Sequence, residues 1–194
     1  MNTELFVRPD ELGVVPEDWS VVQVGDVFNV QQGKQVSKRN REGSNQKPFL
    51  RTRNVLWGKI DPSDLDAMNF TSTEVARLAL REGDLLICEG GETGRTAIWR
   101  GEVDDCYYQN HLHRLRAREG SVDAEFALYW FWYAFRLGRV YYGRGNVTTI
   151  PNLSQSAVRA LPMPLPGIEE QRRIASALRA IEVAAGLQSQ LIRR

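Results

Sequence analysis

Several short polar segments of this 194-residue sequence carry side chains that could hydrogen-bond to the bases and phosphates of a nucleic acid. Reading a base sequence requires side chains that form two hydrogen bonds to one base edge, together with phosphate contacts that fix the register. The candidate DNA-contacting residues are Lys34, Gln35, Lys38, Arg39, Arg41, Arg51, Arg53, Asn54, Thr93, Arg95, Gln109, Asn110, His111, Tyr142, Arg144 and Asn146. For each of them an ordinary solvated surface position is the competing interpretation.

A glycine-rich turn at residues 90–94 could bring bare backbone close to a phosphate, because glycine has no side chain to block the approach. Thr93 and Arg95 border this turn and could contribute polar contacts. A plain β-hairpin is the competing interpretation of the same glycines.

The charge of the chain is unevenly distributed, although its net charge is only +1. Between Gln31 and Lys59 the single acid is Glu42, whereas the bases are Lys34, Lys38, Arg39, Arg41, Lys47, Arg51, Arg53 and Lys59. The next segment, up to Asp105, is mainly acidic, and arginines return from Arg114 onward. Such clustering is compatible with a basic face for a polyanion on an otherwise neutral protein.

Motifs for the common reactions on DNA are missing from the sequence. It contains no N-P-P-Y or D-P-P-Y motif for adenine methylation, no glycine motif for S-adenosylmethionine in a βαβ unit, and no P-loop. A nuclease motif of the P-D…E-x-K type fails because no lysine follows Lys59. His111 and His113 would share one face of a strand, but no cysteine or acid stands beside them as a further metal ligand. We therefore expect no enzymatic activity, no cofactor and no metal.

The composition favours a soluble, cytoplasmic protein. No apolar run is long enough to span a membrane, and the first residues lack the order of a signal peptide. Cys88 and Cys106 are too few for a disulfide framework and lack the spacing of metal ligands.

Secondary-structure patterns predict an α+β domain with a twisted, mostly antiparallel sheet and helices. Strands are expected within residues 21–30, 48–60, 84–99 and 106–117, with a polar loop at 34–47. Thr71 and Glu74 form a capping box that predicts a short helix. A further helix over residues 122–140 holds five aromatic residues, which we expect in the core or against a partner rather than as a stacking platform for bases: Trp130, Phe131, Trp132, Tyr133 and Phe135.

The last part of the sequence predicts a proline-stiffened linker followed by a long amphipathic helix. Prolines at positions 162, 164 and 166 alternate with apolar residues, and no proline follows them. The seam of a coiled coil is indicated by apolar residues at three- and four-residue steps, namely Ile174, Leu178, Ile181, Ala185 and Ile192. Packing of this helix on its own domain is the alternative. We expect one domain over residues 1–162, and a linker with a spacer or dimerisation helix over residues 163–194.

Two patterns, one near each end of the chain, resemble a known family. The C-terminal pattern consists of Pro162, Pro164, Pro166, Glu170, Gln171, Ile174, Ala175 and Leu178. The N-terminal pattern consists of Gly13, Pro16 and Trp19, followed by VGDVFNVQQGK. Together they resemble the specificity subunits of type I restriction-modification systems, and the resemblance covers nearly the whole chain. It implies a target-recognition domain followed by a conserved spacer helix.

The resemblance also implies a mode of action. Members of that family typically hold two target-recognition domains apart with two antiparallel helices, and each domain reads one half of a split DNA sequence. The expected partners are double-stranded DNA, methylation subunits that dock on the helices and, through them, restriction subunits. This sequence holds one such domain and part of one helix, so we expect a half-sized subunit, a truncated product or a piece of a larger protein. A second copy could supply the missing helix, and its two-fold axis would then require a palindromic target.

Two alternative functions remain open. The chain could be the recognition part of a fused restriction-methylation enzyme. It could also be an interaction module that sequesters methylation subunits, or a sibling specificity subunit, without reading DNA.

Overall fold

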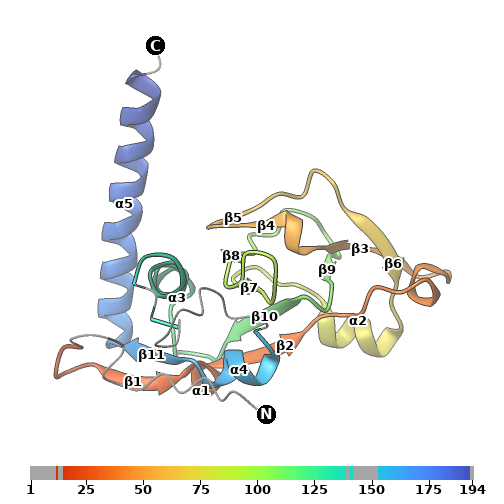
Figure 1. Ribbon diagram of the computed structural model, residues 1–194, viewed down its shortest axis with the longest axis horizontal. Coiled ribbons are helices and arrows are strands. Elements are labelled where there is room, and N and C mark those ends of the chain that lie inside the picture. The colour runs from red at the N-terminus through yellow and green to blue at the C-terminus, as the bar shows by residue number, and fades with distance from the viewer. Residues whose placement is uncertain (1–11, 13–14, 139, 142–152, 193–194) are drawn as a thin grey trace.

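The computed structural model describes residue 12 and residues 15–138, 140–141 and 153–192 (Figure 1). The strands are β1 Ser20–Gln23, β2 Phe28–Gln32, β3 Gln46–Leu50, β4 Val55–Leu56, β5 Lys59–Ile60, β6 Asp66–Asn69, β7 Leu85–Cys88, β8 Thr96–Ile98, β9 Tyr107–Tyr108, β10 Leu112–Ala117 and β11 Pro162–Leu165. The helices are α1 Val24–Val27, α2 Ser72–Leu78, α3 Ala124–Trp132, α4 Gln155–Ala160 and α5 Ile168–Ile192, with the short turns η2 Arg39–Arg41, η3 Thr52–Asn54 and η4 Tyr133–Leu137.

Most strand pairs are antiparallel, which confirms the predicted α+β class. The largest sheet has the order β2-β10-β7-β8, and all of its pairs are antiparallel. A second sheet has the order β6-β3-β9, in which β3 and β9 run parallel. Two smaller pairs are also present in the described residues, the hairpin β4-β5 and the antiparallel pair β1-β11.

The central strand β7 is buried on both faces, which explains its uninterrupted apolar run LLIC. Successive side chains of a strand point to opposite faces. Leu85 and Ile87 accordingly pack into a core with α3 and α4, whereas Leu86 and Cys88 pack into a second core with β3 and β9. The sheet therefore joins the two halves of the domain, and both hydrophobic cores depend on it.

Helix α2 begins at the predicted capping box. The hydroxyl oxygen of Thr71 accepts a hydrogen bond from the backbone N–H of Glu74 at 3.3 Å, and the Glu74 carboxylate accepts one from the backbone N–H of Thr71 at 2.9 Å. Two otherwise unpaired donors at the helix start are satisfied in this way.

The segment 106–117 forms two strands, not the single strand that the sequence pattern predicted. Strand β9 belongs to the sheet of β3, and β10 belongs to the sheet of β2 and β7. Between them the chain turns, because backbone N–H groups at Gln109 and Asn110 bind the carbonyls of Leu50 and Lys34 at 2.9 and 2.8 Å. The break is thus set by segments that are distant in sequence.

Gly33 lies where two backbone segments meet at this break. A Cβ atom at this position would lie 2.3 Å from the carbonyl oxygen of Gln109 and 2.4 Å from that of Tyr108. Both oxygens belong to hydrogen-bonded backbone, so neither can move aside cheaply. We expect Gly33→Ala to lower the free energy of unfolding by about 1–3 kcal/mol, the usual cost of overpacking. Chemical denaturation measures this effect. Gly90→Ala is the control, because a Cβ there meets nothing within 4 Å; equal losses in the two variants would contradict the steric explanation.

The proline-rich segment is a strand, which corrects its interpretation as a linker. Residues Pro162–Leu165 form β11, which pairs with β1 along its whole length, and Met163 is fully buried. Prolines are tolerated here because the two-stranded sheet leaves one side of β11 without a ladder partner. The predicted domain boundary at residues 162 and 163 falls inside this strand, and the junction with α5 lies at Pro166 and Gly167.

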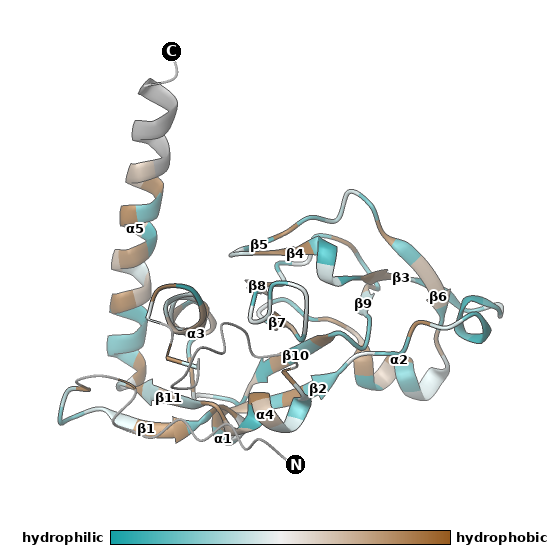
Figure 2. Cartoon of the chain, viewed as in Figure 1, coloured by the Kyte–Doolittle hydropathy of each residue, from teal (hydrophilic) through white to brown (hydrophobic). Residues whose placement is uncertain are grey.

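Helix α5 leaves the base of the domain and extends away from it (Figure 1). Apolar residues recur along the helix with polar residues between them (Figure 2). In the described part of the chain, no helix combines the length and the apolar character that crossing a bilayer requires.

Helix α3 continues into η4, and the two together form the predicted aromatic helix. Phe131 and Phe135 are buried in the core beside β7, as expected. Trp132 and Tyr133 are 37% and 45% exposed. This exposure leaves part of the aromatic surface open to a partner.

Candidate nucleic-acid interface

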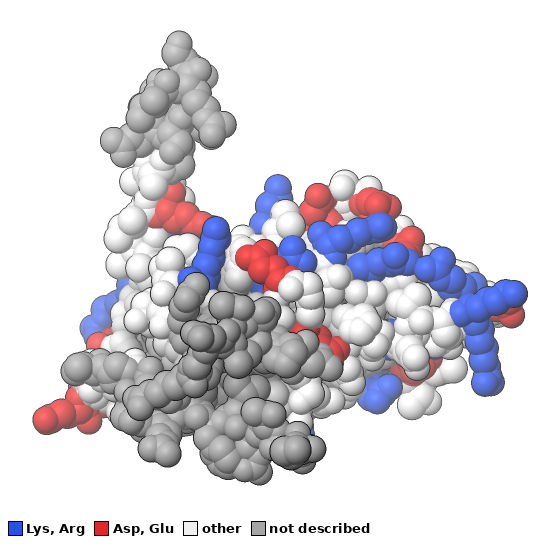
Figure 3. Space-filling view, in the orientation of Figure 1, with Lys and Arg blue, Asp and Glu red and all other residues white. Residues whose placement is uncertain are grey.

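Exposed basic side chains gather on the half of the domain that carries β3 to β6 and η2, away from α5 (Figure 3). Lys38, Arg39 and Arg41, which we call the basic loop, lie on and next to η2 and are exposed. Within the described residues no ion pair involves any of these three. Their charges are therefore available to an external anion.

Arg51 and Arg53 lie on the same half of the domain but are held by acids. Arg51 forms an ion pair with Asp66, and Arg53 forms one with Asp64 at 2.9 Å. The Arg53–Asp64 pair is largely exposed, with side-chain exposures of 47% and 73%. Exposed ion pairs contribute only about 0–1 kcal/mol, so a phosphate or base edge can replace the carboxylate at little cost.

Lys34 supports the fold instead of facing solvent. Its ammonium group lies 2.6 Å from the Glu74 carboxylate and donates a hydrogen bond to the carbonyl of Asn69 at 2.8 Å. Burial alone would raise the pKa of Glu74, but hydrogen bonds from Lys34 and Thr71 outweigh it and lower that pKa. The Glu74 carboxylate therefore stays ionised, and its pair with Lys34 fastens the start of α2 to the segment that follows β2.

Asn54 is also occupied within the protein. It is 3% exposed, its side-chain N–H groups donate to the carbonyls of Asp61 and Asp64 at 2.9 and 3.0 Å, and its side-chain oxygen accepts from the backbone N–H of Arg51 at 2.8 Å. These bonds brace the loop that presents Arg51 and Arg53. Asn54 therefore supports this loop of the candidate interface from inside the domain.

The glycine turn at 90–94 forms the hairpin between β7 and β8. Gly94 has a φ of 84°, and a Cβ atom there would lie 2.3 Å from the ring of Phe135. Its lack of a side chain is therefore explained by packing on η4. Thr93 is buried, while Arg95 is partly exposed and donates a hydrogen bond to the carbonyl of Thr52 at 2.9 Å.

The polar cluster at 109–111 is split between core and surface. Gln109 is 8% exposed, and Asn110 is partly buried with its backbone carbonyl accepting from Gln32 at 2.9 Å. His111 is 60% exposed and lies 3.3 Å from the Glu89 carboxylate. The candidates Tyr142, Arg144 and Asn146 lie outside the described residues.

His113 does not share the exposed environment of His111. It is fully buried, and its Nε2 lies 2.7 Å from the carbonyl of Leu153, to which it donates. Burial lowers the pKa of His113, so the ring is held neutral in the fold. Among the described residues no cluster of three or more histidine, cysteine or acidic side chains could bind a metal ion.

The buried His113 predicts a loss of stability in mild acid. Its pKa is lower in the folded state than the unfolded value of about 6.5, so below that pH the unfolded chain binds a proton that the fold excludes. The free energy of unfolding should therefore decrease as the pH falls through about 6.5. Denaturation between about pH 7.5 and 5.5 should show a shallower decrease for His113→Gln than for the wild type and for the control His111→Gln. The same slope in all three proteins would contradict this role of His113.

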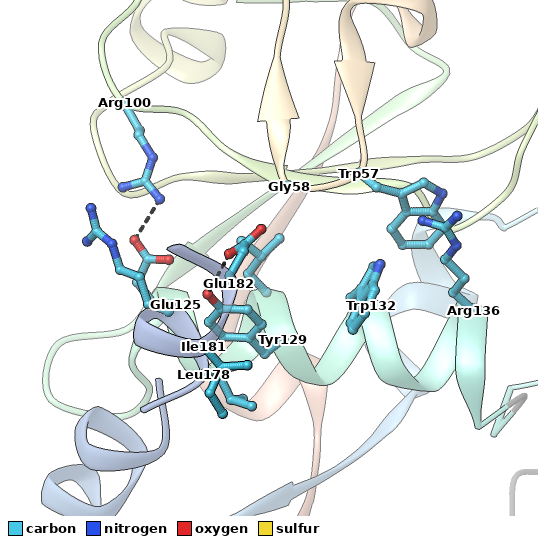
Figure 4. A pocket seen from close by; sticks show the side chains of 12 residues that line it. Trp57, Gly58, Arg100, Glu125, Tyr129, Trp132, Arg136, Leu178, Ile181 and Glu182 are labelled. Atoms are coloured by element: carbon cyan, nitrogen blue, oxygen red, sulfur yellow. Dashed lines mark hydrogen bonds and ion pairs between the residues drawn. The ribbon is translucent and has the colours of Figure 1, made fainter. Parts of the chain in front are cut away.

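A groove separates α3, α5 and the turn between β4 and β5 (Figure 4). Its volume is about 470 Å³, and its apolar lining includes Trp57, Trp132, Leu178 and Ile181. The hydroxyl of Tyr129 donates to Glu182 at 3.0 Å across one end of it.

The groove shows that the first half of the predicted coiled-coil stripe faces its own domain only in part. Ile174 is partly buried, whereas Leu178 and Ile181 are 38% and 65% exposed. Ala185 is exposed, and the side chain of Ile192 lies outside the described residues. The packing alternative therefore holds for the base of α5, and the stripe beyond it stays accessible.

The architecture, an α+β unit from whose base one long helix extends, is found in solved specificity subunits. A chain from a structure on complex assembly and conformational transition of the type I R-M system has a TM-score of 0.70 and 21% identity, over 97% of this chain and 44% of that one. The HsdS subunit from Thermoanaerobacter tengcongensis has a TM-score of 0.67 and 20% identity, over 92% and 41%. The fold is thus that of specificity subunits.

Sequence comparison assigns the family. Residues 16–193 match the type I restriction modification DNA specificity domain, so the chain belongs to this family. The type I restriction enzyme MjaVIII specificity subunit of Methanocaldococcus jannaschii is 24% identical over 187 residues, which cover 90% of this chain. A protein named as the MjaX specificity subunit of the same organism is 26% identical over 175 residues. The chain spans 41–42% of the length of these relatives.

Proposed function

We propose that this chain is a DNA-binding specificity unit that directs a type I methyltransferase, and in the complete system an endonuclease, to a target sequence. The observation that carries the proposal is the basic loop, three exposed cations without an ion pair in the described structure, on a chain of the DNA specificity domain family. Phosphate contacts from such side chains supply most of the non-specific affinity for DNA. The unit itself carries out no chemistry and takes no cofactor; the methylation subunit supplies both.

The proposed DNA-contacting set is smaller than the set of candidates from the sequence. Lys34, Asn54, Thr93 and Gln109 are buried, and we assign them to support of the interface. The exposed or partly exposed candidates stay in the set, namely Gln35, Lys38, Arg39, Arg41, Arg51, Arg53, Arg95, Asn110 and His111. Tyr142, Arg144 and Asn146, which lie outside the described residues, stay predictions. The basic loop supplies phosphate contacts. The guanidinium of Arg53 is the best placed group for two hydrogen bonds to one base edge, because it is exposed and already oriented by Asp64.

We further propose that α5 joins this unit to its partners. Leu178 and Ile181 are exposed apolar residues on a helix that extends from the domain. A methylation subunit, or a second recognition unit with its own helix, would cover them. In this scheme the recognition unit extends to Pro166, and the spacer helix follows from Gly167.

Co-expression with a type I methylation subunit tests the proposal. Mapping of methylated adenines in the host DNA should give one defined target that disappears when the basic loop is neutralised. The chain alone, incubated with S-adenosylmethionine, should leave DNA unmodified. Methylation of the same sites without this chain would contradict the proposal, as would methylation by the purified chain alone. Capture of the methylation subunit with no effect on target choice would favour the sequestering function.

A further inference from the structure

Gln171 occupies an unusual place for an amide side chain, because it is 1% exposed at the base of a helix whose described side chains are mostly exposed. Its Oε1 accepts a hydrogen bond from the backbone N–H of Asp123 at 2.8 Å. Its Nε2 donates one to the carbonyl of Pro166 at 2.8 Å. One side chain in the first turn of α5 thus binds both the start of α3 and Pro166, the residue directly after β11.

The two elements that Gln171 binds are themselves fixed to each other. Asp123 caps α3 through its side chain, which accepts from the N–H of Phe126 at 2.9 Å. The indole of Trp130 in α3 donates to the Tyr141 hydroxyl at 2.7 Å, and that hydroxyl donates to the Pro162 carbonyl in β11 at 2.8 Å. Burial raises the pKa of Tyr141, so its hydroxyl keeps its proton. Gln171 therefore joins α5 to a rigid base.

Gln171 adds to the contacts that hold the base of α5. The helix is connected to β11 through Gly167, where an added Cβ atom would meet nothing within 4 Å, so the junction is sterically open. Ala175 is buried against the domain, and Tyr129 binds Glu182, but these contacts lie on the α3 side of the helix. Gln171 alone, among the described side chains of the first turn, also binds the carbonyl of Pro166, directly after β11.

The chemistry of the site selects glutamine. The position needs an acceptor and a donor about one carboxamide apart, and both must be satisfied because the group is buried. Glutamate would accept from Asp123 but would face the Pro166 carbonyl with a second acceptor. Methionine matches the length and volume of glutamine but offers neither bond.

We propose that Gln171 is a positioning residue that fixes the angle between α5 and the recognition unit, and thereby the separation of the half-sites that two joined units read. The second part of this statement rests on the proposed function. Because α5 has 25 residues, a small tilt at its base moves its far end a long way. A tilt of about 10° displaces the far end by roughly 6 Å, which corresponds to about two base-pair steps of DNA. A small change at Gln171 is therefore amplified into a change of target spacing.

The angle can be measured without DNA. Spin labels at Glu82→Cys and Ala184→Cys, two exposed positions on the domain and on α5, report the distance between them by pulsed electron resonance. Native Cys88 and Cys106 are buried and stay away from the label. We expect one narrow distance distribution for the wild type and a broadened or shifted one for Gln171→Met and for Gln171→Glu.

Gln155→Leu is the matched control, because it removes a glutamine hydrogen bond to the Val30 carbonyl within the domain and none to α5. Its distance distribution should match the wild type. An unchanged distribution in both Gln171 variants overturns the proposal, whether or not the chain binds DNA. Should one variant fail to fold, the other decides, since methionine keeps the volume and glutamate keeps the acceptor.

The spacing is tested on DNA that carries two half-sites at varied separations. The wild type should prefer one separation, and Gln171→Met should lose that preference while its affinity for a single half-site stays the same. A broadened distance distribution with an unchanged spacing preference would overturn the link to the target. If the wild-type chain binds no half-site at all, that result would instead count against the proposed function.

Discussion

Replacing Lys38, Arg39 and Arg41 together with glutamine should remove most of the affinity of the chain for DNA and leave its fold intact. The three side chains are exposed and form no ion pair in the described structure, so their loss breaks no internal contact of their charged groups. Each phosphate contact releases a counterion and adds about 0.9 to the slope of log affinity against log salt. If all three contact phosphates, the slope should flatten by about three units.

Fluorescence anisotropy with a labelled duplex, between about 50 and 200 mM salt, measures both quantities. The control variant replaces Arg118, Arg159 and Arg172, three exposed arginines in other parts of the chain, with glutamine. It loses the same charge and should keep the wild-type slope. Equal slopes in both variants would show that net charge alone, and not the basic loop, governs binding.

Replacing Leu178 and Ile181 together with aspartate should abolish self-association, or docking of a methylation subunit, while the recognition unit stays folded. An apolar side chain buried in an interface contributes about 1.5–3 kcal/mol. A charge buried there without a partner costs several kcal/mol more. Both residues are partly exposed in the chain by itself, so the domain should tolerate the change.

Analytical ultracentrifugation reports assembly, and circular dichroism reports the fold. The control variant carries Ala180→Asp and Val183→Asp, which add the same charges to exposed positions that helical periodicity places away from both Leu178 and Ile181. The control should assemble like the wild type. If the variant at Leu178 and Ile181 assembles like the wild type, the apolar stripe of α5 packs only against its own domain. Collapse of the fold would mean that these residues belong to the core.

Local signals predicted the parts of the fold that local chemistry determines. The Thr71–Glu74 capping box, the β7–β8 hairpin and the aromatic helix were all expected from short patterns, and the structure confirms them. Each of these features depends on residues that are close to one another in the sequence. The α+β class followed from the order of these elements.

The remaining differences arise from contacts between segments that are distant in sequence. The sequence pattern predicted Lys34 as a surface base, yet it forms a partly buried ion pair with Glu74, forty residues further on. Strand β9 separates from β10 because Leu50 and Lys34 supply hydrogen-bond partners for the turn between them. The prolines before α5 suggested a spacer, but β1 near the start of the domain pairs with them. No local pattern contains this information.

Selection of bound sequences from a library of randomised DNA duplexes tests the central claim, that this chain reads a DNA sequence, most directly. The purified wild-type chain should enrich one short defined half-site, and Arg53→Gln should relax the preference at one position of that half-site by about 1–3 kcal/mol, the usual contribution of a bidentate base contact. The variant in which glutamine replaces Lys38, Arg39 and Arg41 should bind far less DNA, but the DNA that it binds should be enriched in the same half-site. Binding of the wild type to all duplexes with equal affinity, or to none, would contradict the account.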